Sequence, residues 1–181
     1  MSTPGARDLT STWGVDAFNN PGVARFRKQL DAQSWANDLV LTSIESIPLT
    51  AHSSPDYIRA RQLVPHNQLA RGAWLARIRA SPIALPKDWF PAWTVEETRQ
   101  VCAQNDKEWA GYLDQLKDVH LAKLVDYASS EGRVYRSSIE DVLIHVFDHE
   151  SYHRGQIARL VSQCGGQRAS TDFIAFSRLA L

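Results

Sequence analysis

Four long stretches of this sequence repeat their apolar residues with the spacing of an α-helix. In the first, from Pro21 to about Ile47, apolar side chains recur mostly at four- or five-residue steps, and no proline interrupts the chain before Pro48. The other stretches run from about Pro55 to Ala80, from Thr94 to about Lys117 and from Ser138 to about Cys164. Helices of this kind must bury their apolar faces against one another, so we predict an all-α fold, a bundle of four antiparallel helices.

Capping residues and prolines mark where these helices begin and end. Thr94, with two acidic residues behind it, predicts an N-cap, and Ser138 with Asp141 predicts a capping box. The double glycine at 165–166 ends the last helix. Pro65 predicts either a kink or the start of a fresh helix. The segment 81–94 contains three prolines, which indicates an ordered crossover loop.

Two shorter segments complete the expected fold. Residues 124–127 and 134–135 flank a polar turn, which predicts a short β-hairpin between the third and fourth helices. The tail to Leu181 carries apolar residues, among them Phe173 and Phe176, and we expect it to pack back on the bundle.

Composition excludes several classes of function. The 181 residues fit one domain, and 20 Lys and Arg balance 20 Asp and Glu, so we expect no nucleic-acid partner. Arg71, Arg77 and Arg79 form the best basic cluster, which we interpret as a solvated helix face. Cys102 and Cys164 are far apart in sequence and indicate reduced thiols. With no signal-peptide or membrane-spanning run, the expected location is the cytoplasm, with no membrane partner.

The fourth helix carries histidines at three positions four residues apart, His145, His149 and His153. A step of four residues turns side chains by only about 40° with a rise of about 6 Å, so neighbouring histidines can chelate one ion, whereas His145 and His153 are about 12 Å apart along the axis. His153 lies within the apolar stripe of the helix and His149 at its edge. The alternative is an inward pair held by hydrogen bonds to side chains or water. His145 falls outside the stripe with Tyr152 and Gln156, where it suits a supporting or substrate-side role.

A third ligand has to come from another helix, and His66 is the best candidate because it shares a face with Ala70 and Ala73, which allow close helix approach. His52 and His120 lie in expected loops or helix ends and are interpreted as surface residues. Neutral imidazoles should release a metal as the pH falls below about 6.

The sequence from His149 to His153 also spells HESYH, the H-E-x-x-H pattern of zinc metalloproteases, in which the glutamate is the general base. Those enzymes take a third ligand downstream, and after His153 only Asp172 could serve. Glu150 could still reach a metal-bound water, or it could be a structural carboxylate.

The stretch IEDVLIHVFDHESYHRGQIARLV, residues 139–161, resembles the last helix of the DinB-like (damage-inducible, YfiT-related) family of metal-dependent enzymes. The WAN at 35–37, the HNQLARGAW at 66–74, the loop ending in FPAWTVEE and the TDF at 171–173 resemble the family in the same order. Glu150 departs from it, since relatives often carry a small or amide residue there. The resemblance covers residues 26–178 and implies one domain over 1–181, with 1–20 as an N-terminal extension.

The resemblance implies a four-helix bundle with a three-histidine site for zinc or nickel at His66, His149 and His153, and often a homodimer. Three neutral imidazoles leave a zinc-like ion a fourth position for water or substrate. Relatives include thiol-dependent S-transferases and a thiol-dependent isomerase, so we expect a metal-dependent enzyme that acts on a small molecule, a thiol transferase or hydrolase with a low-molecular-weight thiol as cosubstrate. Candidates for catalysis are His145, Glu150, Tyr152 and Gln156. A non-catalytic, stress-related metal-binding bundle is the alternative.

Overall fold

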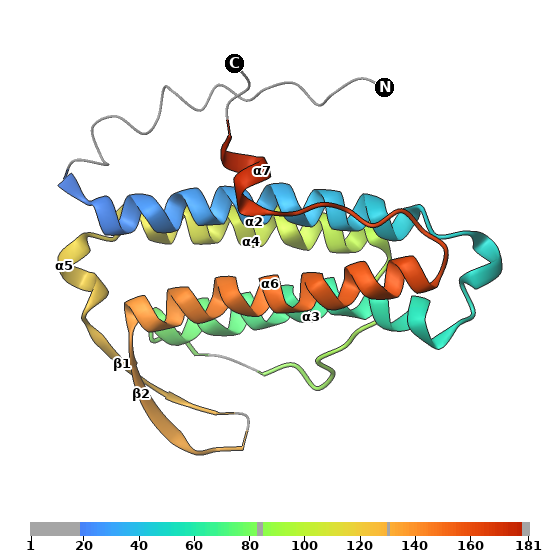
Figure 1. Ribbon diagram of the computed structural model, residues 1–181. Helices are drawn as coiled ribbons and strands as arrows, with labels where there is room; N and C mark the ends of the chain where they lie inside the picture. The colour runs from blue at the N-terminus through green and yellow to red at the C-terminus, as the bar shows by residue number, and fades with distance from the viewer. Residues whose placement is uncertain (1–18, 83–84, 130, 179–181) are drawn as a thin grey trace.

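Four long helices form the body of the molecule in the computed structural model, which describes residues 19–82, 85–129 and 131–178 (Figure 1). The all-α fold and the short hairpin predicted from the sequence are both confirmed. The long helices are α2 (Pro21–Glu45), α3 (Pro55–Ile78), α4 (Val95–Gln115) and α6 (Ile139–Gln163). The shorter elements are the 3-10 helix η1 (Leu49–Ala51), α5 (Asp118–Leu121), β1 (Leu124–Ala128), β2 (Val134–Ser138) and α7 (Phe173–Ser177).

The helices do not alternate in direction along the chain, so the prediction of four antiparallel helices is wrong. Arg61 near the start of α3 donates to the Trp93 carbonyl just before α4, at 2.8 Å, and Arg79 at the end of α3 donates to the Glu108 carbonyl at 3.0 Å. α3 and α4 therefore run the same way, and the described part of the connection between them, residues 79–82 and 85–94, lies along the length of the bundle (Figure 1). The predicted crossover loop is what makes this possible.

The helix ends follow the predicted caps. The hydroxyls of Thr94 and Ser138 accept hydrogen bonds from the backbone N–H groups three residues on, and both helices have complete capping boxes. Gly165 ends α6 with φ of 78°, a left-handed conformation that favours glycine. One cap was not predicted: Asp118 of α5 accepts from the backbone N–H groups of Gly22 and Val23, at 2.9 Å each, at the start of α2.

The hairpin and the tail are placed against the bundle at opposite sides (Figure 1). β1 and β2 pair antiparallel from Leu124 with Ser138 to Ala128 with Val134, so the second strand ends at the N-cap of α6. The tail packs back as predicted, since the Phe176 ring lies 5.7 Å from that of Trp35 on α2. Residues 1–18 and 179–181 lie outside the described residues. Among the helices described, none is long and apolar enough to cross a membrane.

The core has two apolar regions separated by a layer of buried polar side chains. One region includes Phe26, Trp109 and Leu143, and the other includes Leu41 and Leu63. On each long helix, buried polar residues lie between the stretches that supply the two regions. We call this set the polar layer; it comprises Gln33, Asn37, Asn67, Gln68, Arg71, Asn105, Glu150 and Arg154.

Candidate metal centre

His66 is carried by the middle of α3, directly after a buried proline. Pro65 lies inside one continuous helix, so the alternative that a fresh helix starts there is wrong. The face that bears His66 also bears Ala70 and Ala73, and it packs against α6, which bears His149 and His153. The small side chains on this face leave room for the imidazoles of both helices.

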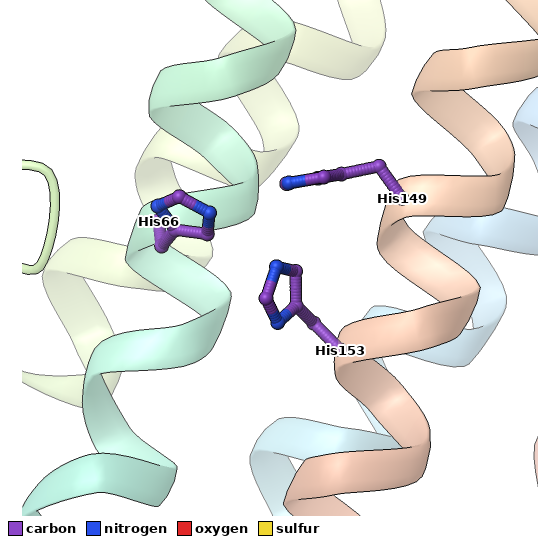
Figure 2. A group of neighbouring side chains, drawn as sticks. All are labelled: His66, His149 and His153. Carbon is purple, nitrogen blue, oxygen red and sulfur yellow. The ribbon is translucent and has the colours of Figure 1, made fainter.

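The three predicted ligands meet between α3 and α6 (Figure 2). One ring nitrogen from each of His66, His149 and His153 lies within 4.8 Å of the other two. The ring centroids are 5.1 Å apart for His66 and His149, 4.9 Å for His66 and His153, and 4.6 Å for the two histidines of α6. This spacing is short enough for one ion with ligand bonds of about 2.0–2.1 Å to each nitrogen after small side-chain adjustments.

Hydrogen bonds orient two of these rings. Nδ1 of His66 donates to the carbonyl oxygen of Trp89 at 3.0 Å, and Nδ1 of His153 donates to Oε1 of Gln156 at 3.1 Å. With the proton on Nδ1, the lone pair of Nε2 is free to bind a metal, and such bonds fix both tautomer and ring orientation. The Phe90 ring stacks on His66 at 4.3 Å and holds that imidazole from the side.

The pKa of each imidazole favours the neutral form that a metal requires. Burial lowers the pKa of His149 to about 4, and the neighbouring rings of His153 and His66 add to the effect. Burial also lowers the pKa of His66 and of His153, although their hydrogen bonds to Trp89 and Gln156 oppose it. Protons therefore compete for these nitrogens at a lower pH than the value of about 6 expected from ordinary imidazoles.

Comparison with known proteins gives the family of this chain. The sequence pattern described as the DinB family matches residues 24–180. This chain belongs to the DinB family. Protein DinB of Bacillus subtilis (strain 168) is 21% identical to it over 149 residues, which cover 77% of this chain and 86% of that protein. No solved structure gives a significant match.

The other candidate residues of this DinB-family chain differ in how closely they contact the triad and in how exposed they are. His145 lies next to it, with its ring 5.7 Å from that of His149 and 5.2 Å from that of Trp74. Gln156 supports His153 through the bond to Nδ1. Tyr152 touches His153 at 5.1 Å between rings but is 66% exposed. Of the two histidines interpreted as surface residues, His120 is exposed, whereas His52 is half-buried and stacks on Tyr57 at 4.0 Å.

A cavity of about 330 Å³ opens beside the triad. Its walls come from α3, α6 and the crossover loop: His66, Ala70, Ala73, Trp74, Arg77, Trp89, Phe90 and His149. Sequence reasoning did not identify the aromatic walls. The sequence signals for these walls were Trp74, which follows His66 by about two helical turns, and the two adjacent aromatic residues of the crossover loop.

Glu150 lies in the polar layer. Its side chain is 1% exposed, with Oε1 at 3.3 Å from Nε of Arg71 and Oε2 at 4.0 Å from Nη1 of Arg154. Arg71 also pairs with Asp106 at 2.7 Å. The interpretation of Arg71 as part of a solvated face is therefore wrong: the guanidinium is 1% exposed because two carboxylates compensate its charge inside the bundle. A carboxylate engaged in this way is poorly suited to the general-base role that the H-E-x-x-H pattern suggests.

Proposed function

We propose that the chain binds one divalent metal ion, zinc or nickel, through His66, His149 and His153. The observation that carries the proposal is the convergence of three ring nitrogens from two helices within 4.8 Å. The His153 side chain is buried and those of His66 and His149 are half-buried, and one metal ion can accept the lone pairs of all three rings at once. The lowered pKa values and the hydrogen bonds at Nδ1 of two rings both favour this use.

We further propose that the centre is catalytic and acts on small molecules, as a thiol S-transferase or a hydrolase. Three protein ligands leave a zinc-like ion a fourth position, and a bound ion there lowers the pKa of a water or thiol that it coordinates. The protein's own groups supply the rest: Trp89 and Gln156 orient two ligands, and the cavity offers a place for a substrate next to them. A low-molecular-weight thiol is the proposed cosubstrate.

The cavity favours an enzyme over a bundle that only stores or carries a metal. A purely structural site usually fills all ligand positions with protein groups and is closed to solvent. Here the described residues place no fourth His, Cys, Asp or Glu ligand at the triad, and the walls of an open cavity include two of its three histidines.

Elemental analysis of protein purified without an affinity tag tests the metal site. We expect about one zinc or nickel per chain in the wild type and loss of the metal in His66→Ala and in His149→Ala, since each removes one of three ligands. His120→Ala, which removes an exposed histidine far from the triad, should retain the metal. Metal that persists without His66, or a wild type that takes up none, would overturn the proposal.

A further inference from the structure

We propose that the cavity beside the triad binds a small carboxylate with an apolar or aromatic body, its carboxylate facing Arg77 and its body lying between Trp74, Trp89 and Phe90. This inference rests on the proposed function, because it names the class of substrate for the same centre. It is carried by the size of the cavity, its aromatic walls and the sign of its charge.

The size and the walls indicate a small, largely apolar ligand. At about 330 Å³ the cavity lies at the lower end of the range for small-molecule sites, about 300–1,000 Å³, and leaves no room for a folded peptide or a dinucleotide. Three of the lining residues are aromatic, from α3 and the crossover loop. Aromatic side chains bind an apolar body through the area that it buries against them. Here the contact is with ring edges and the faces that remain, because Arg77 lies over the Trp74 ring and His66 and Arg59 lie against the Phe90 ring.

The charge of the cavity is positive. Among the described residues, Arg77 is the one charged residue that lines the cavity, and no carboxylate lies within ion-pair distance of its guanidinium. Arg77 is held in place over the Trp74 ring at 4.5 Å and by a hydrogen bond to the Ala128 carbonyl at 3.0 Å. No other hydrogen bond joins the guanidinium to a described residue, so its other N–H groups can bind a ligand, and guanidinium groups recognise carboxylates well.

Two further features add to the positive potential. Arg59 lies over the ring of Phe90, a lining residue, at 4.0 Å, which brings a second positive charge close to the cavity. The one buried carboxylate of α6, Glu150, is engaged by Arg71 and Arg154. Three neutral histidines would also leave the charge of a divalent ion uncompensated. Both the arginines and the ion should therefore attract an anion.

A cationic ligand is the main competitor, because aromatic walls can also bind cations. The position of Arg77 argues against it. Its guanidinium already occupies the face of Trp74, and a second cation in a cavity of this size would be repelled by it.

Calorimetric titration of zinc-loaded protein with phenylacetate and with its neutral counterpart phenylacetamide tests the inference. We expect the carboxylate to bind at least about tenfold more tightly than the amide, the effect of one charge-assisted hydrogen-bonded contact. Arg77→Gln should reduce that preference about tenfold, with the zinc content unchanged. Arg79→Gln, an exposed arginine of the same helix end that does not line the cavity, should leave it unaltered.

A second variant tests the aromatic walls. In the wild type, phenylacetate should bind more tightly than acetate, and Trp74→Leu should reduce that difference at constant zinc content.

Each contrary result has a distinct meaning. Equal binding of acid and amide, with about one zinc per chain, would overturn this inference and leave the proposed function standing. A preference for the acid that survives Arg77→Gln would assign the anion to the metal alone and would equally overturn the role given to Arg77. Absence of a metal site would overturn the proposed function and this inference together.

Discussion

Replacing Glu150 by glutamine distinguishes between two roles for this residue of the HESYH sequence, a structural carboxylate and the general base of a metalloprotease. The side chain keeps its shape and can still form hydrogen bonds, but it loses the negative charge that lies between Arg71 and Arg154. In the wild type, the negative charges of two carboxylates, Glu150 and Asp106, equal the positive charges of two guanidinium groups in this part of the core. In the variant, one positive charge has no compensating carboxylate. Asp106 still pairs with Arg71 at 2.7 Å, and Arg154 keeps its bonds to Gln33 and Ser151.

The magnitude follows from this partial compensation. Removing one partner of a buried ion pair costs about 3–5 kcal/mol when the other is left alone. The remaining bonds reduce that cost, so we expect Glu150→Gln to lower the free energy of unfolding by about 2–4 kcal/mol. For a domain of this size, with about 2–4 °C per kcal/mol, the melting temperature should fall by roughly 4–16 °C. Burial raises the pKa of the Glu150 carboxyl, and the positive charges of Arg71 and Arg154 oppose this rise.

Urea denaturation of metal-loaded wild type and variant, followed by circular dichroism, measures the effect, and Glu131→Gln is the matched control because its carboxylate is 75% exposed. We expect the control to lie within about 0.5 kcal/mol of the wild type, and Glu150→Gln to retain its metal. Unchanged stability together with loss of a peptide-cleaving activity would refute the structural role and restore the protease interpretation.

Three further predictions concern stability and can be checked by urea denaturation at equilibrium. Asp118→Asn should lower the free energy of unfolding by about 1 kcal/mol because the carboxylate caps α2, whereas Asp114→Asn on the surface should cost less. Gly166→Ala should cost about 1–3 kcal/mol because a Cβ there would lie 2.7 Å and 2.8 Å from two aliphatic side chains; Gly155→Ala, with nothing within 4 Å, should be neutral or stabilising. Metal-free protein should lose stability as the pH falls from about 6.5, the unfolded histidine pKa, towards about 4, the pKa of His149, because the unfolded chain then binds more protons. His149→Ala should show a weaker dependence on pH; an unchanged slope would contradict the assignment.

The existence and limits of the long helices could be predicted because their signals are local. The capping residues Thr94 and Ser138 and the glycine at 165 each act within a few residues of the chain. The direction of α4 could not be predicted, since a helical period does not record which neighbour a helix packs against. The short helix α5 was also missed, because its Asp118 caps a helix start 96 residues earlier in the sequence.

In the candidate site, too, the features with local sequence signals could be predicted and those that depend on long-range packing could not. Two of the three proposed ligands share one helix at a spacing of four, and the sequence predicted that pair directly, whereas His66 required the assumption that α3 faces α6. The aromatic cavity was missed because Trp89 and Phe90 reach the triad from the crossover loop, whose path depends on the whole fold. Arg71 was misinterpreted because an arginine is rarely buried unless paired, and its partners lie on two other helices.

The polar layer sets the axial alignment of the helices. Shifting α6 along α3 by one turn, about 5.4 Å, would push Glu150 into apolar surroundings on either side and leave Arg71 without it. Such a shift would also carry His149 and His153 past His66, so the alignment that satisfies the buried charges is the one that assembles the triad. The fold alone thus assembles the proposed metal site, without help from an ion. A chelator should therefore empty it without unfolding the bundle, in contrast to small zinc domains whose folding depends on the metal.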